Sequence, residues 1–273
     1  ATFGDMTRVP GSTSSLLKEQ AEGRSVSIVY SPLDALKLAQ ENPDQQIVFV
    51  GVGFETTTPL VAMAIKRAKA LGLENFSVFV AHKNMPGALE TIVSDPSLRI
   101  DALILPGHVS TIIGMKPYEF LAKKYGIPGV ITGFEAVDVL QGVAMIMRQL
   151  HEGRAEIEIA YTRGVAPEGN QVAVAAINEV FHTVDATWRG LGVIPGSGYA
   201  IRPEFAEFDA FQRFEPAVEP TQEPKGCRCG DVLRGMMAPN ECPLFRKVCT
   251  PENPVGPCMV SSEGSCAAYF RYL

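Results

Sequence analysis

Six cysteines lie between residues 227 and 266, and the first 226 residues of the chain contain none. Thiolates are soft ligands that bind zinc and iron–sulfur clusters, and a pair of them can also exchange between dithiol and disulfide. Packing alone gives no reason for such a distribution, so it predicts one module that holds a soft metal, an iron–sulfur cluster or exchanging thiols. The six are Cys227, Cys229, Cys242, Cys249, Cys258 and Cys266, in the pattern C-x-C-x12-C-x6-C-x8-C-x7-C.

The spacing of the cysteines narrows the choice. Zinc sites usually contain two C-x2-4-C knuckles, whereas this segment has one C-x-C followed by single, widely spaced cysteines, so zinc fits poorly. The common ferredoxin run C-x2-C-x2-C is also absent. Six cysteines are two more than a four-iron cluster needs, and the surplus could form an exchanging pair. Cys229, beside Arg228, and Cys258, between Pro257 and Met259, are suitable positions for it.

A second candidate site lies at Gly51–Thr57 (GVGFETT), where a buried strand is expected to end and a helix to begin. Ligands of open α/β sheets bind at this carboxyl edge, where the helix N-terminus offers free N–H groups. A phosphate loop is disfavoured, because the segment matches neither common phosphate-loop pattern and Glu55 would repel a phosphate. Glu55, Thr56 and Thr57 could line another kind of site, or the segment is a glycine turn with a threonine N-cap.

A third segment, Pro106–Gly114, carries His108 at the end of another expected strand. If both strands belong to one parallel sheet, Glu55 and His108 project from the same edge. A carboxylate there could fix the tautomer of the imidazole or exchange protons with it. On local sequence alone, a histidine that is simply hydrogen-bonded at a strand end is the favoured alternative. His82, after a further strand, could join the same edge.

The elements that must position these residues alternate between strands and helices. This alternation predicts an α/β fold, an αβα body in which a parallel sheet is covered on both faces. The expected strands are Ser25–Tyr30, Ile47–Gly53, Phe76–Ala81, Ala102–Leu105, Pro128–Ile131 and Ile157–Tyr161. The expected helices run from Ser31 to about Gln40, from Thr57 to near Gly72, over roughly Ala136–His151 and over Gln171–Val180.

The alternation is lost after Val184, and Glu215–Lys225 is rich in proline and glutamate, which is typical of an extended linker. We therefore expect an α/β body over residues 1–190, a return segment and linker over 191–225, and a small cysteine-rich domain over 226–273.

The net charge of −6 argues against a nucleic-acid surface, which needs a basic stripe. No apolar run approaches the roughly 18 residues of a membrane span, and no basic-then-apolar signal segment opens the chain. A cytoplasmic location is therefore expected. Thiols stay reduced there, which favours metal binding or redox chemistry over a disulfide scaffold.

With these segments in place, the chain resembles the HypD family of [NiFe]-hydrogenase maturation factors. The matching pieces are GFETT at Gly53–Thr57, P-x-H-V-S-x3-G at Pro106–Gly114, and the segment from Gly226 to Phe270 with its cysteine spacing. The resemblance covers essentially the whole chain, and its cysteine-rich segment is the most specific part.

The resemblance implies a cytosolic scaffold that carries the iron of the Fe(CN)2CO group together with a HypC-type small chaperone, while a HypE-type protein donates the cyanide. It implies an assembly factor more than an enzyme of repeated turnover. It also implies a C-terminal domain with a [4Fe–4S] cluster held by Cys227, Cys242, Cys249 and Cys266. Cys229 and Cys258 match a redox-active dithiol, as in ferredoxin:thioredoxin reductase, and electrons from the cluster would reach this pair or the iron site.

The sequence departs from the family in one respect. It lacks the C-G-x-H and G-P-G-C-P-V-C motifs whose cysteines are thought to bind the iron, and it begins without methionine. We expect a chain truncated at its N-terminus. Two other functions stay open: a self-contained, cluster-dependent disulfide reductase, and a docking scaffold whose cysteine module is held by zinc.

Overall fold

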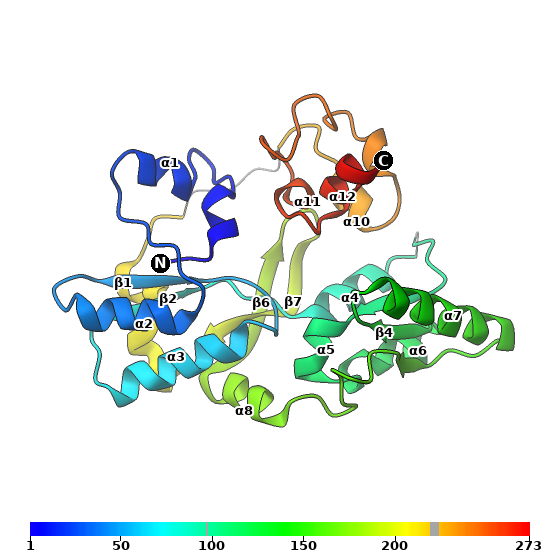
Figure 1. Ribbon diagram of the computed structural model, residues 1–273, viewed down its shortest axis with the longest axis horizontal. Coiled ribbons are helices and arrows are strands. Elements are labelled where there is room, and N and C mark those ends of the chain that lie inside the picture. The colour runs from blue at the N-terminus through cyan, green and yellow to red at the C-terminus, as the bar shows by residue number, and fades with distance from the viewer. Residues whose placement is uncertain (97, 219–223) are drawn as a thin grey trace.

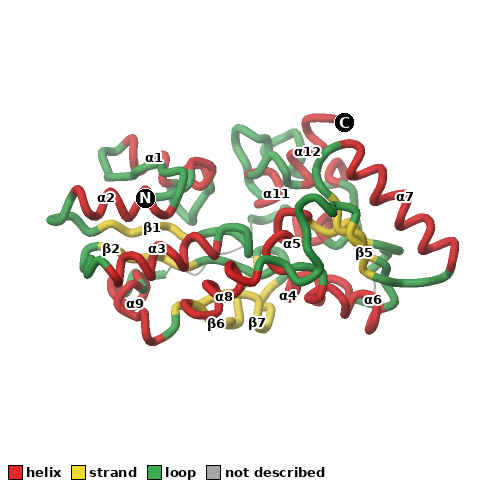
Figure 2. Tube along the Cα trace, turned by 60° about the horizontal axis from the view of Figure 1, so that its bottom comes forward, coloured by secondary structure: helices red, strands yellow, loops and turns green. Residues whose placement is uncertain are grey.

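The computed structural model describes residues 1–96, 98–218 and 224–273. Two α/β units lie at opposite ends of the body, a β-hairpin stands between them, and the cysteine-rich segment forms a separate module beside the hairpin (Figures 1 and 2). Part of the predicted linker Glu215–Lys225, residues 219–223, lies outside the described residues. None of the helices in the described ranges has the length and apolar content needed to cross a bilayer.

The first unit is built on two parallel strands, β1 (Ile47–Gly51) and β2 (Phe76–Val80), with Ile47 opposite Phe76. Helices α2 (Pro32–Glu41) and α3 (Thr58–Ala70) pack beside them. The predicted start of α2 is confirmed, because the Ser31 hydroxyl accepts the Leu33 N–H at 3.2 Å and Pro32 opens the helix.

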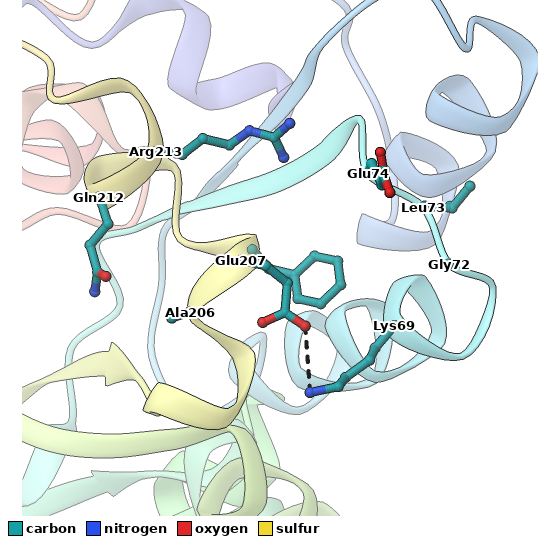
Figure 3. Close-up of a pocket in the computed structure, with 9 residues that line it drawn as sticks. Lys69, Gly72, Leu73, Glu74, Ala206, Glu207, Gln212 and Arg213 are labelled. Carbon is teal, nitrogen blue, oxygen red and sulfur yellow. Dashed lines mark ion pairs between the residues drawn. The ribbon is translucent and has the colours of Figure 1, made fainter.

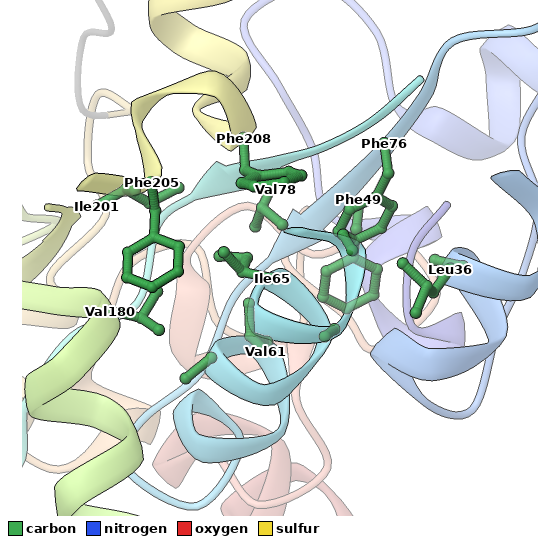
Figure 4. Close-up of a cluster of buried hydrophobic side chains, with 14 of the residues drawn as sticks. Leu36, Phe49, Val61, Ile65, Phe76, Val78, Val180, Ile201, Phe205 and Phe208 are labelled. Atoms are coloured by element: carbon green, nitrogen blue, oxygen red, sulfur yellow. The ribbon is translucent and has the colours of Figure 1, made fainter. Parts of the chain in front are cut away.

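Aromatic and branched side chains from several elements form the core of this unit (Figure 4). Burying such side chains is the main favourable term in folding, so this core fixes the strand ends on which the candidate site is built. Its labelled members are Leu36, Phe49, Val61, Ile65, Phe76, Val78, Val180, Ile201, Phe205 and Phe208.

The second unit has three parallel strands in the order β3-β4-β5, with β4 in the middle. The strands are β3 (Leu103–Pro106), β4 (Gly129–Thr132) and β5 (Ile157–Ile159). Its helices are α4 (Met85–Val93), α5 (Gly107–Ile113), α6 (Glu119–Tyr125) and α7 (Ala136–Glu152), with a 3-10 turn η2 (Lys116–Tyr118). Both α6 and α7 end at a glycine in the left-handed region, Gly126 and Gly153.

The chain then returns to the first unit. Helix α8 (Gln171–Val180) packs against α3, and the antiparallel hairpin of β6 (Phe181–Trp188) and β7 (Gly192–Ile201) follows directly. The 3-10 helix η3 (Pro203–Phe208) and helix α9 (Ala210–Phe214) complete the first unit.

Short helices and turns make up the rest of the described chain. The N-terminal segment contains η1 (Gly4–Arg8) and α1 (Leu16–Ala21). The cysteine module contains α10 (Cys229–Leu233), η4 (Pro239–Glu241), α11 (Pro257–Val260) and α12 (Ser265–Tyr272).

The mixed α/β fold with parallel strands is confirmed, but three details of the prediction are wrong. The strands form two separate parallel sheets, β1-β2 and β3-β4-β5, and the hairpin stands between β2 and β4 in Figure 1. Ser25–Tyr30 contributes an isolated bridge of Ile28 to Thr2 instead of a strand. The region after Val184, where no further element was expected, holds most of the long hairpin.

Candidate functional site

The first site is the turn between β1 and α3, which carries Glu55. This turn runs beside the segment after β2, where the Lys83 N–H donates to the Gly53 carbonyl at 2.9 Å. The Glu55 carboxylate accepts the Met85 N–H at 3.0 Å and 3.3 Å, so it binds the first residue of α4. Only 2% of Glu55 is exposed. Burial raises the pKa of its carboxyl to about 7, although hydrogen bonds from the N–H groups of Glu55 and Met85 oppose the shift.

The Thr57 side chain hydrogen-bonds to the loop that precedes α3. The Thr57 hydroxyl donates back to the carbonyls of Phe54 at 3.2 Å and Val52 at 3.4 Å, and it makes no N-cap hydrogen bond. Thr57 thus occupies the predicted N-cap position of α3, but its side chain makes no capping hydrogen bond. Thr56 is half-buried. Gly53 has a φ of 131°, and a Cβ there would lie 2.4 Å from the Thr57 hydroxyl, so the turn requires glycine.

His108 does not meet Glu55 in the way the sequence suggested. It lies exposed in α5 of the second unit, and its strand β3 belongs to a different sheet from β1. Its ring stacks on Phe134, with 4.3 Å between the ring centroids. No hydrogen bond or ion pair between Glu55 and His108 is found within the described ranges. The prediction that the two side chains project from one sheet edge assumed a single sheet. It is wrong because β1 and β3 lie in different sheets.

Two tyrosines that the sequence did not single out lie in the electrostatic range of Glu55. Tyr118, which is fully buried, has its hydroxyl 3.4 Å from that of Ser110 in the PGHVS segment. Burial raises the pKa of Tyr118 most, the Ser110 contact opposes this, and the charge of Glu55 adds to it. Burial and then Glu55 also raise the pKa of Tyr199 on β7. Tyr118 therefore contacts the PGHVS segment and lies within the electrostatic range of Glu55.

His82 follows β2 as expected but points into the interior. Its exposed fraction is 1%, and within the described part of the chain both ring nitrogens lack a hydrogen-bond partner. The ring lies against Gly51, where a Cβ would come within 2.8 Å of its Cε1 atom. Burial lowers the pKa of His82 to about 4, so the imidazole is neutral at physiological pH.

The raised pKa of Glu55 predicts a pH-dependent stability. The ordinary pKa of the carboxyl is 4.5 and its pKa in the folded chain is about 7, so between these pH values the folded chain binds a proton that the unfolded chain has released. The contribution of Glu55 to the free energy of unfolding should therefore fall by about 3 kcal/mol as the pH rises from 4.5 through 7. The lowered pKa of His82 acts in the opposite direction over an overlapping range, so the loss is measured as the difference between wild type and Glu55→Gln in urea denaturation at pH 5 and pH 8. A difference that stays the same at both pH values would contradict the assignment to Glu55.

The second site is the cysteine module, in which all six thiols share one apolar cluster with Val232, Phe245 and Met259. The Cys258 thiol contacts those of Cys229 and Cys266, the latter at 3.1 Å between sulfurs. Its hydrogen bond with Cys229 lowers its pKa, but the contact with Cys266, burial and neighbouring thiols together raise the pKa to about 12.

The remaining thiols adjoin this trio. A Cβ on Gly256 would lie 2.7 Å from the Cys227 sulfur and 3.9 Å from that of Cys258, so this glycine passes between them. Burial raises the pKa of Cys227, and the nearby thiols of Cys242 and Cys249 add to the shift. The Cys249 sulfur accepts the Val255 N–H at 3.4 Å.

The donors fit an iron–sulfur cluster in their chemistry. Soft thiols inside an apolar shell are the environment in which such clusters are held. In the ranges described, no three Cys, His, Asp or Glu side chains converge as ligands of one metal ion. The fit therefore rests on donor type and proximity. Arg228, which could have lowered a thiol pKa, pairs with Asp231 at 2.6 Å.

A pocket of about 630 Å³ lies away from both sites (Figure 3). It is lined by Lys69 and Glu207, whose charged groups are 3.4 Å apart, and by Glu74 just before β2. This is the opposite end of the strand from the one that leads to His82. The pocket contains none of the predicted site residues.

Comparisons with known proteins identify the family of the chain. The family model described as "HypD: Hydrogenase formation hypA family" matches residues 1–273. The chain is 50% identical to the hydrogenase expression/formation protein HupD of Azotobacter chroococcum, over 99% of this chain and 73% of the relative. It is 47% identical to the hydrogenase maturation factor HypD of Cupriavidus necator, over 99% and 74%, and 46% identical to HypD of Escherichia coli, over 99% and 73%. The chain therefore belongs to the HypD family of hydrogenase maturation factors.

Proposed function

We propose that this chain acts as a scaffold and redox factor in assembling the Fe(CN)2CO group of [NiFe]-hydrogenases, together with a HypC-type chaperone and a HypE-type cyanide donor. The observation that carries the proposal is the presence of two chemically distinct sites in one family member. One is a buried carboxyl at a strand end, and the other is a cluster of six thiols. An assembly factor for an iron centre needs to handle both protons and thiol redox chemistry.

We propose Cys227, Cys242, Cys249 and Cys266 as ligands of a [4Fe–4S] cluster, which would supply electrons beside the remaining thiols. Cys229 and Cys258 then form the exchanging pair. Their thiols are in hydrogen-bond contact, which suits a pair that alternates between dithiol and disulfide. The iron being assembled is the cargo of the protein.

At the first site, we propose that Glu55 holds or releases a proton close to the iron cargo. A carboxyl with a pKa of about 7 is populated in both protonation states at physiological pH, as a general acid or base requires. Thr56 and Thr57 shape the turn that presents it. His108, exposed beside Phe134, lies on the second unit as a contact for cargo or partner.

One alternative function is a cluster-dependent disulfide reductase. The contact of Cys258 with Cys229 favours it, because such a reductase requires only the module and a thioredoxin-like substrate. The other alternative is a docking scaffold whose module is held by zinc, and the number of available thiols favours it.

Metal analysis separates these functions. After anaerobic purification, the proposal expects about four irons and four sulfides per chain. One zinc without sulfide would overturn both redox functions. Turnover of a thioredoxin-like disulfide without a HypC-type protein would favour the reductase over the assembly factor.

A further inference from the structure

The β6–β7 hairpin touches both sites. We infer that it couples them, so that the redox state of the Cys229–Cys258 pair changes the Glu55 turn through Trp188 and the hairpin tip. This inference rests on the proposed function of the thiol pair, and it adds a positioning residue, Trp188, that no motif marks. Figure 1 shows the hairpin rising from the body to the cysteine module.

At its base, the hairpin packs against the turn that carries Glu55. The Trp188 ring packs on Phe54, the residue before Glu55, with 5.9 Å between the ring centroids. The Trp188 indole N–H donates to the Ser197 hydroxyl at 2.8 Å, which fixes the ring along the hairpin. The Ser197 carbonyl accepts the Asn84 N–H at 2.9 Å, one residue before the N–H that binds Glu55. Movement of the hairpin would therefore shift both sides of the Glu55 carboxylate.

At its tip, the hairpin lies against the backbone of Cys229 and Gly230. A Cβ on Gly230 would lie 2.4 Å from the Gly190 carbonyl oxygen, so these two backbones meet with no space between them. Gly230 follows Cys229, and Gly190 is two residues from Trp188. A second contact on this side of the module is the ion pair of Arg234 with Asp95, at 3.7 Å.

The two states of the coupled element are the dithiol and the disulfide. In oxidation by glutathione disulfide, Cys229 and Cys258 lose their thiol hydrogens and form one S–S bond. The glutathione S–S bond breaks and two glutathione thiols take up the two hydrogens and two electrons. The new bond draws the Cys229 sulfur toward that of Cys258, and we expect Gly230, the next residue, to shift relative to Gly190. Neither cysteine forms a disulfide in this structure, so the contacts between Gly190 and Gly230 belong to the dithiol state and are expected to favour it.

Coupling of this kind is reciprocal, so weakening the hairpin contacts must alter the thiol equilibrium. We expect Trp188→Leu and Phe54→Leu each to shift the equilibrium with glutathione toward the disulfide by about 2- to 30-fold, the range for residues that modulate coupling. The measurement uses the anaerobically purified full chain, thiol labelling at set glutathione ratios, and mass spectrometry to identify the Cys229–Cys258 bond.

A matched control is the ring pair of Phe79 with Phe211, whose centroids are 6.3 Å apart on the far side of the first unit. Phe211→Leu removes a similar ring contact and should leave the equilibrium unchanged. Since Trp188 is the one tryptophan of the sequence, its emission reports the hairpin alone in wild type and in Phe54→Leu. We expect its accessibility to iodide to increase on oxidation in the wild type and not in Cys229→Ser.

The outcomes separate the two proposals. If the pair oxidises but Trp188→Leu and Phe54→Leu match Phe211→Leu, and the emission does not respond, the coupling is refuted while the thiol exchange stands. If no Cys229–Cys258 bond forms at any glutathione ratio in the wild type, the thiol exchange and the coupling both fall.

Discussion

Replacing Glu55 by alanine is expected to abolish hydrogenase maturation while the visible absorption of an iron–sulfur cluster stays intact. The carboxyl is 2% exposed, binds the first N–H of α4 and influences the pKa values of Tyr118 and Tyr199. A positioned general acid or base contributes roughly 100- to 10,000-fold to a rate, and its loss at an obligatory step leaves little product. Hydrogenase activity is measured in cells that lack their own HypD-family protein and express this protein or its variant.

Two further variants test whether the effect is specific to Glu55 and whether it depends on proton exchange. Glu74→Ala removes an exposed carboxylate at the opposite end of β2, and we expect maturation to continue. Glu55→Gln keeps an oxygen that can accept the Met85 N–H but cannot exchange a proton. If Glu55→Gln restores maturation, the residue positions α4 and moves no proton. If cluster absorption falls in parallel with activity in Glu55→Ala, the residue is structural and the proposal fails.

The local elements of the fold could be predicted because single-segment signals determine them. The apolar run Ile47–Gly53 and the cap Ser31-Pro32 specify β1 and the start of α2 without reference to the rest of the chain. The division into two sheets could not be predicted, because it depends on which strands become neighbours. The hairpin was missed because glycines and Pro195 interrupt β7, and these residues are usually read as a loop.

The candidate site shows the same limit. The sequence identifies Glu55 correctly as a strand-end residue, but it cannot tell that α4 closes over it or that Tyr118 comes close. Tyr118 carries no local signal, since a tyrosine after a lysine and a proline resembles any turn. The tertiary fold alone brings its hydroxyl to Ser110, whereas the predicted pairing of Glu55 with His108 is not formed. For the cysteines, spacing predicted one shared module, and all six thiols do lie in one cluster.

Substituting the six cysteines one at a time by serine is expected to divide them into two groups. Serine at Cys227, Cys242, Cys249 or Cys266 should reduce bound iron and sulfide from about four each toward zero, because a hydroxyl is a poor ligand for iron in a cluster. Serine at Cys229 or Cys258 should leave iron and sulfide in place and abolish disulfide formation. Iron and sulfide are counted after anaerobic purification, and thiol exchange is followed with glutathione.

The structure offers matched pairs for this experiment, because two members of the ligand group are as buried as the two cysteines of the exchanging pair. Cys249 and Cys229 are 7% and 6% exposed, and Cys266 and Cys258 are 6% and 7% exposed. A general loss of packing would therefore affect both members of a pair alike, and only a difference in ligand role can separate them. The roles of Cys258 and Cys266 are the hardest to tell apart, because their sulfurs are only 3.1 Å from each other. If Cys258→Ser loses the iron and Cys266→Ser retains it, these two residues exchange roles, and the pair that reacts with glutathione becomes Cys229 and Cys266.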